Sequence, residues 1–194
     1  MLRLPGLLAT VLLFSSAVST LSADEPAKAG DVTTVKLKDL TLKLPKSWSE
    51  SDLKSSMRLA TYDIPASEGD KEKGELAIST FAGGGGGVDA NLARWVDQFD
   101  AEGRTTVLKK GKAGENEYYI ADLSGTYKKS VGPPILRKTE PAPGYKMLGV
   151  ILVMKNEEVY FLKLTGPQKT IKAQAETFRK TFGGNSTAEE AYEL

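Results

Sequence analysis

Five consecutive glycines, Gly83–Gly87, stand directly before a segment whose apolar residues recur with helical spacing. Glycines before a helix can hold a phosphate, because the free N–H groups of the first helical turn point at the anion. Neither known pattern is complete. Val88 and Asp89 stand where a P-loop needs Lys followed by Ser or Thr, and Val88 also replaces the third glycine of the dinucleotide spacing. We expect Asp89 to cap the helix with its carboxylate, where a phosphate would have to lie. The run therefore favours a flexible connector, whose backbone could contact a protein partner at Gly83, Gly84, Gly85, Gly86 and Gly87.

Other residues with catalytic potential lack the companions that their chemistry requires. Ser51 and Lys54 have the spacing of the Ser–Lys pair in penicillin-recognising enzymes, but the "SDN" and "KTG" elements are missing. Asp97, Asp100 and Glu102 could touch a cation, yet they do not follow the calcium-loop spacing. The chain contains no His and no Cys, which excludes imidazole bases, thiol nucleophiles and the commoner zinc sites. We therefore expect a protein that is not an enzyme and that carries no cofactor or metal.

The first residues predict export from the cytoplasm. In residues 1–23, one basic residue, Arg3, is followed by an apolar run from about Leu7 to Phe14 and then by small polar residues ending at Ala23. This order is typical of a secretory signal peptide, and the apolar run is much shorter than the roughly 20 residues that span a bilayer. Cleavage after Ser22 or Ser19 is also reasonable, because Leu21 is bulky for the position two before Ala23. We expect a periplasmic or secreted protein that is not transmembrane after cleavage.

The charge balance argues against nucleic acid as a partner. The chain has 26 basic and 25 acidic residues, and loss of Arg3 with the signal peptide leaves a formally neutral chain. A nucleic-acid binder normally shows a basic excess, which this sequence lacks. Asn185 begins a glycosylation acceptor pattern, which matters only in a eukaryotic secretory pathway.

Apolar residues alternate with polar ones over most of the chain after residue 32, and this alternation predicts strands. Two stretches instead show helical spacing. In the first, Leu92, Trp95, Val96 and Phe99 share a face, with Gly103 as the expected end of the helix. The second is a closing helix that starts near Pro167 and carries an apolar stripe of Ile171, Ala175, Phe178 and Phe182. The strands are expected within 33–45, 57–65, 74–82, 104–111, 116–129, 146–155 and 157–166.

Short connections between these strands favour antiparallel pairing, and the class that follows is α+β with helices packed on one large sheet. We expect a polar linker at 24–32, a single domain at 33–184 and a flexible acidic tail at 185–194.

The order of elements from about residue 33 to 184 resembles a known fold. The stretches "LTLKLPKSWSE", "NLARWVDQF", "YYIADLSGTY", "VYFLKLTGPQKTI" and "AETFRKTF" resemble uncharacterised exported bacterial proteins with a PsbP-like fold. That fold, an antiparallel sheet with helices on both sides, occurs in extrinsic lumenal proteins of photosystem II and in a Ran-binding nuclear protein. The resemblance implies a non-enzymatic binding or assembly module and supplies no catalytic residues.

Two binding hypotheses follow. In the first, the proline-rich loop 130–145 docks a protein partner through Ile135, Leu136, Arg137 and Lys138, together with the glycine run. In the alternative, the protein carries a small ligand in an apolar pocket between the sheet and the first helix, lined by Trp95 and Tyr119. A hydrolase ranks third, because no spacing brings a catalytic pair together. The partner and the oligomeric state are left open.

Overall fold

The computed structural model describes residues 31–52, 56–132, 136 and 138–194. The predicted signal peptide, linker residues 24–30, Lys54, Ile135 and Arg137 therefore lie outside the described residues. No helix in the described ranges is long and apolar enough to cross a membrane. The elements, in chain order, are β1 Val32–Leu37, β2 Leu40–Pro45, β3 Ser49–Glu50, β4 Ala60–Ile64, β5 Gly74–Thr80, the 3-10 helix η1 Ala82–Gly86, α1 Val88–Val96, β6 Thr105–Ala113, β7 Asn116–Ser130, β8 Thr139–Val153, β9 Val159–Pro167, α2 Gln168–Ala173, α3 Ala175–Thr181, the 3-10 helix η3 Ser186–Ala188 and β10 Glu190–Ala191.

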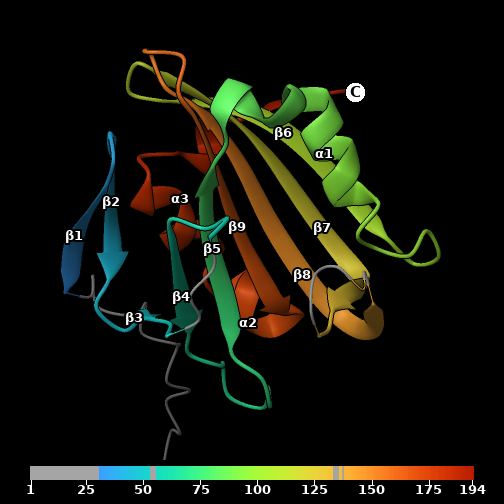
Figure 1. Ribbon diagram of the computed structural model, residues 1–194. Helices are drawn as coiled ribbons and strands as arrows, with labels where there is room; N and C mark the ends of the chain where they lie inside the picture. The colour runs from blue at the N-terminus through green and yellow to red at the C-terminus, as the bar shows by residue number, and fades with distance from the viewer. Residues whose placement is uncertain (1–30, 53–55, 133–135, 137) are drawn as a thin grey trace, which may run out of the picture. The chain divides into compact units, whose positions relative to one another are not determined.

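Within these residues, eight strands form one antiparallel sheet in the order β10-β6-β7-β8-β9-β5-β4-β3, and β1 pairs with β2 in a separate hairpin (Figure 1). The helix α1 covers one face of the large sheet, and α2, α3 and the β1–β2 hairpin cover the other. This arrangement confirms the predicted α+β class, with a largely antiparallel sheet flanked by helices.

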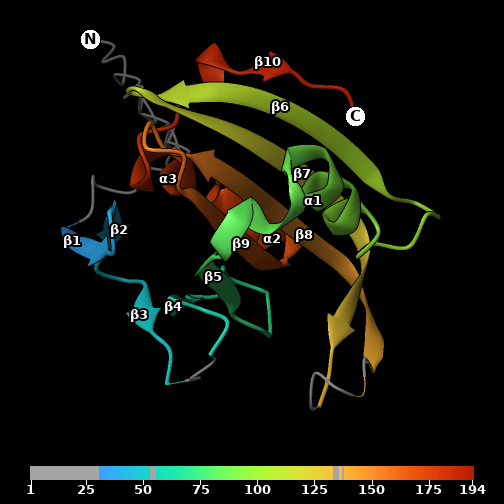
Figure 2. The same ribbon diagram turned by 45° about the horizontal axis from the view of Figure 1, so that its top comes forward.

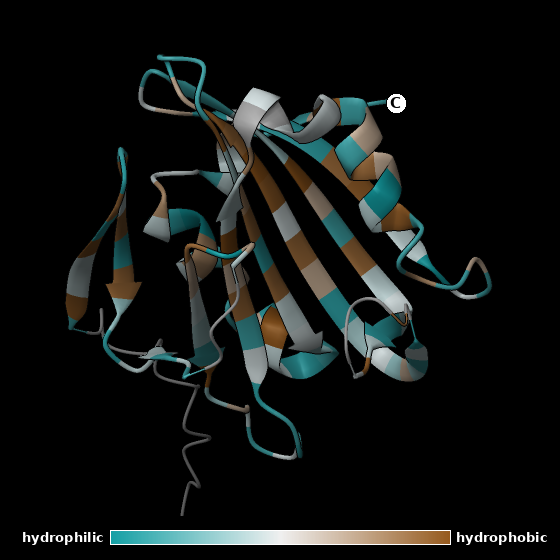
Figure 3. Cartoon of the chain, in the orientation of Figure 1, coloured by the Kyte–Doolittle hydropathy of each residue, from teal (hydrophilic) through white to brown (hydrophobic). Residues whose placement is uncertain are grey.

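The alternation along the strands divides the core between the two faces of the sheet. On β7, Tyr118 and Ile120 point to the α2–α3 face, whereas Ala121 and Leu123 point to the α1 face. Figure 3 shows the resulting brown and pale bands along the central strands. On β8, nearly every residue from Met147 to Leu152 is apolar and buried, because both faces of this strand are covered.

The helix α1 lies close to the sheet because β8 has a glycine, Gly149, beneath it. A Cβ atom on Gly149 would come within 2.5 Å of the Trp95 ring, so only glycine fits under this side chain. The helix ends at Val96, earlier than the predicted end at Gly103. The chain then turns onto the sheet, where Phe99 forms a bridge with Tyr127, and pairing with β7 replaces the expected last helical turn.

The glycine run connects β5 to α1 as a 3-10 helix, and Asp89 does not cap α1 as predicted. Gly87 occupies the N-cap position, and the Asn91 amide donates to the carbonyls of Gly85 at 3.1 Å and Gly87 at 2.6 Å. The Asp89 carboxylate instead accepts a hydrogen bond from the Tyr192 hydroxyl at 2.6 Å. The carboxylate that we expected to satisfy the helix is thus used to hold the end of the chain.

The closing helix differs from the prediction in continuity. It is divided at Gln174 into α2 and α3, and Pro167 lies at the N-cap of α2 rather than in its first turn. The apolar stripe is still correct, since Ile171 and Phe178 are fully buried.

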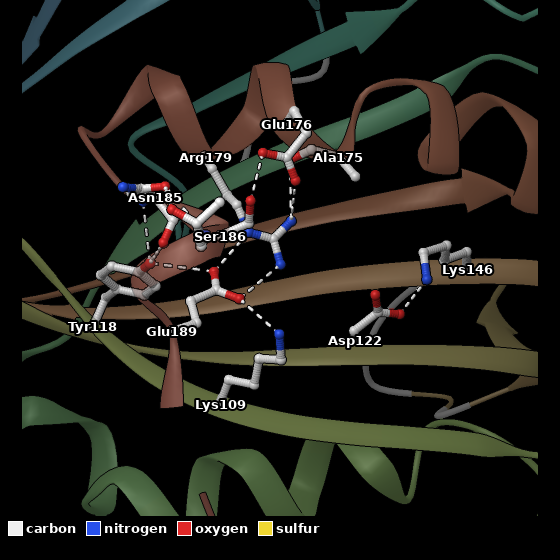
Figure 4. A network of polar contacts seen from close by, with 11 residues as sticks. Lys109, Tyr118, Asp122, Lys146, Ala175, Glu176, Arg179, Asn185, Ser186 and Glu189 are labelled. Atoms are coloured by element: carbon white, nitrogen blue, oxygen red, sulfur yellow. Dashed lines mark hydrogen bonds and ion pairs between the residues drawn. The ribbon is translucent and has the colours of Figure 1, made fainter. Parts of the chain in front are cut away.

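The C-terminal residues 185–194 differ most from the predicted flexible tail. They form η3 and then β10, which lies along the outer edge of β6 (Figure 2). Glu189 enters the interior at this point and pairs with Arg179 and Lys109, while Tyr118 donates to it at 3.2 Å (Figure 4). An acidic composition predicted a solvated tail, but this carboxylate has one cationic partner ten residues away, Arg179, and one on the distant strand β6, Lys109.

Candidate functional site

A pocket of about 570 Å³ opens on the α1 face of the sheet, beyond the C-terminal end of α1. The turn between β4 and β5 forms one side, and the strands β7, β8 and β9 form the floor. We call it the tyrosine–lysine pocket. Its lining residues are Arg58, Asp63, Lys71, Glu72, Lys73, Gly74, Glu75, Tyr127, Lys129, Ser130, Tyr145, Lys163, Thr165 and Gly166.

Two stacked tyrosines form the aromatic part of the pocket. The rings of Tyr127 and Tyr145 lie 5.9 Å apart between centroids and only 7° from parallel. The register between β7 and β8 shifts next to them, and such irregularities re-aim side chains at functional sites. Lys163 Nζ lies 5.4 Å from the Tyr127 ring centroid and Lys129 Nζ lies 5.6 Å from that of Tyr145, within cation–π distance.

The carboxylates of the pocket are already paired. Arg58 contacts Glu75 at 3.0 Å, and a short contact joins Lys73 to Asp63. The third carboxylate, Glu72, is bonded by Lys129 at 2.7 Å and by the Tyr145 hydroxyl at 2.6 Å.

These bonds also change proton affinities. The hydrogen bond from Lys129, followed by that from Tyr145, lowers the pKa of Glu72. Burial and the bond to Glu72 raise the pKa of Tyr145, and the bond to Glu72 raises the pKa of Lys129. At neutral pH the three groups therefore form a stable arrangement of one anion, one cation and one neutral phenol.

Two lysines remain in excess. Among the described residues, neither Lys71 nor Lys163 has a carboxylate within ion-pair distance. Lys163 is half-buried and bonds to two neutral acceptors, Gln98 Oε1 at 2.9 Å and the Tyr127 hydroxyl at 3.0 Å. The pocket therefore has local positive charge beside an aromatic wall, which suits it to an anionic group.

The residues that the sequence predicted for binding lie in different parts of the structure. Trp95 is 7% exposed, and its ring packs edge-on to Phe161 over Gly149, so it belongs to the core and not to the pocket lining. Tyr119 lines a different cavity of about 350 Å³, and its ring contacts that of Tyr192. The residues that line the tyrosine–lysine pocket include none of the glycine run, and Gly83 borders a third cavity beside Phe81.

The predicted docking loop is shorter than expected, because both flanking strands extend into it. Residues 139–145 belong to β8, and the connection covers only 131–138. Leu136 is 66% exposed, as predicted for a docking residue, and Lys138 is also exposed. Ser130 and Tyr145, at the two ends of the predicted loop, line the tyrosine–lysine pocket.

Sequence reasoning missed the pocket residues of β9. Lys163 and Thr165 are polar residues on one face of an otherwise apolar central strand, "VYFLKLTGP". Two such positions on one face of a buried strand are a signal that could have identified the site.

Comparisons with known proteins identify similar architectures only. No family model matches the chain, and no curated protein matches it. The solution structure of cyanobacterial PsbP from Synechocystis is similar, with 13% identity over 89% of this chain and 99% of the other, at a TM-score of 0.47. A Pseudomonas aeruginosa protein of unknown function is similar with 16% identity over 78% of this chain and 93% of the other, at a TM-score of 0.40. At these scores neither similarity carries an argument about function.

Proposed function

We propose that this protein is a non-enzymatic binding module that docks a protein partner outside the cytoplasm, at the tyrosine–lysine pocket and the adjoining β7–β8 hairpin. The charge of the pocket carries the proposal. Each carboxylate in its lining is paired with a cation, whereas Lys71 and Lys163 have no such partner among the described residues. A partner that presents an acidic group would meet complementary charge in a concave site, and such complementarity steers association and fixes register.

The hairpin supports the same proposal. Leu136 is 66% exposed on the connection between β7 and β8, and both strands line the pocket, through Ser130 at the end of β7 and Tyr145 within β8. Interfaces combine exposed apolar and aromatic residues with a polar rim, and this hairpin offers both beside the pocket.

Site-specific photo-crosslinking tests the proposal. A photoreactive amino acid at position 136 should capture one defined partner in the extracytoplasmic fraction of the source organism. The matched control is position 32, because Val32 is also apolar and 56% exposed but lies on β1. Equal labelling from both positions, or no protein captured from position 136, would contradict docking at the hairpin.

A second variant separates docking from stability. Leu136→Asp should abolish capture from a photoreactive group at position 130 and leave the Tm nearly unchanged, because the leucine is exposed. If Leu136→Asp unfolds the protein, the side chain supports the fold and the docking assignment fails.

The volume of the pocket favours a second candidate function, a small-ligand carrier. About 570 Å³ lies within the roughly 300–1,000 Å³ typical of ligand sites. The ligand would be polar rather than apolar, because most of the lining side chains are charged. Native mass spectrometry of the protein from its own source distinguishes the two, since a carrier releases a small mass on denaturation and a docking module does not.

A further inference from the structure

Thr165 carries a buried hydroxyl whose oxygen has no hydrogen-bond partner among the described residues. The residue is 8% exposed and lies within the sheet, paired with Glu75 on β5 and Met147 on β8. Burying a hydroxyl without a partner costs free energy, and buried polar groups in native proteins are nearly always bonded. Because Thr165 lines the tyrosine–lysine pocket, a ligand in the pocket is a physical explanation for this hydroxyl.

Lys163 offers a charged donor next to this hydroxyl. An ammonium group has three N–H donors, and two of them are directed to Gln98 and Tyr127, both neutral acceptors. Lys163 and Thr165 are two residues apart on β9, so they share a face of the sheet with Cα atoms about 7 Å apart. One charged and one neutral donor are thus held side by side on a strand in the middle of the sheet.

We infer that Lys163 and Thr165 form a subsite for a single carboxylate, carried by a peptide segment of the partner. This inference rests on the proposed docking function. One carboxylate oxygen accepts a hydrogen bond from the remaining N–H of Lys163, and the other accepts a hydrogen bond from the hydroxyl of Thr165. The ligand would satisfy the buried hydroxyl and neutralise the unpaired lysine together.

The other charges of the pocket favour a monoanion over a phosphate. Three carboxylates, Asp63, Glu72 and Glu75, also line the pocket and would repel a dianion more strongly than a single charge. Phosphate sites commonly use the fork of an arginine, but the one arginine of the lining, Arg58, is already paired with Glu75 at 3.0 Å.

An NMR titration of the ¹⁵N-labelled protein tests the subsite. The probe is the capped tripeptide acetyl-Ala-Glu-Ala-amide, and the matched control is the same peptide with Gln in place of Glu. The glutamate peptide should shift the amide signals of Lys163 and Thr165 saturably, and the glutamine peptide should bind about tenfold or more weakly, because it lacks the charge.

Variants assign the two donors. Lys163→Met and Thr165→Val should each weaken binding of the glutamate peptide at least several-fold. Thr165→Ser, which keeps the hydroxyl, should bind the peptide nearly as tightly as the unchanged protein. Unchanged binding by Thr165→Val would overturn the role of the hydroxyl. If Lys163→Met fails to fold, the Thr165 pair decides the question alone.

Other outcomes would overturn the inference and leave the proposed function to its own test. Binding of acetate as tight as that of the peptide would contradict a peptide source, and tighter binding of sulfate would contradict a carboxylate. The absence of a saturable shift with the glutamate peptide would contradict the subsite. Crosslinking from position 136 would still test the docking proposal independently. Success of the titration with failure of crosslinking would keep the carboxylate site but contradict a partner segment as the source of the carboxylate.

Discussion

Arg179 and Glu189 form a bidentate ion pair inside the protein, with Nε donating at 2.6 Å and Nη2 at 3.1 Å to the two carboxylate oxygens. The side chains are 8% and 0% exposed, respectively. Burial alone would lower the pKa of Arg179, but the hydrogen bond and the charge of Glu189 outweigh it, and the pKa is raised. The pair joins α3 to the segment that leads into β10, so it holds the last residues of the chain against the sheet.

Glu189→Gln should destabilise the fold strongly. The variant keeps the shape of the side chain but leaves Arg179 buried with its remaining partner Glu176 at 3.7 Å, and it also removes the 3.5 Å partner of Lys109. Breaking one side of a buried ion pair costs about 3–5 kcal/mol, and urea unfolding would measure this loss.

The matched control for this prediction is Glu190→Gln. Its side chain is 78% exposed and lies 3.8 Å from Lys110, so the change should be smaller than about 1 kcal/mol. Equal losses in the two variants would mean that the buried pair contributes no more than a surface pair.

The order of apolar and polar residues along the chain correctly predicted which faces of the strands are buried. Leu40, Leu42 and Leu44 alternate in the sequence, and all three are buried on one face of a strand. The near-continuous apolar run of β8 also predicted its central position, because a strand covered on both faces needs apolar residues at both parities.

Features that depend on distant partners were not predictable from local pattern. Glu189 has the local setting of a tail residue, and only the return of the chain past Arg179 makes it internal. The pocket depends on strand register, since Lys163 meets Tyr127 only after β7, β8 and β9 have paired. Asp89 fitted the pattern of a cap, but the sequence could not show that Tyr192 returns to its carboxylate.

Tyr192 should titrate at unusually high pH because of Asp89. The hydrogen bond to this carboxylate raises the pKa of Tyr192 to about 12. Since the folded pKa lies above the unfolded value of about 10, the contribution to stability is complete below about pH 10 and is lost as the pH rises toward 12. Tyrosine Cζ NMR shifts would follow the titration.

Two variants test the origin of this pKa. Asp89→Asn should return the pKa of Tyr192 toward about 10, and Tyr192→Phe identifies the signal by its disappearance. An unchanged pKa in Asp89→Asn would show that the carboxylate is not its cause. Because Gly87 rather than Asp89 caps α1, loss of the carboxylate should weaken attachment of the C-terminal residues rather than unfold the helix.

Gly149→Ala should destabilise the contact between β8 and α1. The added Cβ would meet the Trp95 ring at 2.5 Å, and overpacking of a core typically costs about 1–3 kcal/mol. A double-mutant cycle with Trp95→Leu checks the cause: the cost of Gly149→Ala should shrink when the large ring is absent. Additive losses would place the strain elsewhere, for example in the backbone of β8.

Thr165 and Thr170 permit the same substitution at two buried hydroxyls with opposite surroundings. The Thr165 hydroxyl has no partner among the described residues, whereas that of Thr170 donates to Asp70 at 2.6 Å and accepts the Ser67 N–H at 2.9 Å. Thr165→Val should therefore raise the free energy of unfolding by about 1 kcal/mol, because it removes an unsatisfied polar group of similar shape. Thr170→Val should lower it by about 1–3 kcal/mol, because it removes both bonds of the hydroxyl and leaves the Ser67 N–H without this acceptor, while Asp70 keeps the bond from the Thr170 N–H at 2.9 Å. Thermal and urea unfolding of both variants would measure the two opposite changes in the free energy of unfolding.

A loss of stability in Thr165→Val similar to that in Thr170→Val would mean that the Thr165 hydroxyl is satisfied in solution without a ligand, and it would remove the reason for a subsite at this position. A gain in stability accompanied by weaker binding of the glutamate peptide would identify Thr165 as a residue retained for binding at the expense of stability.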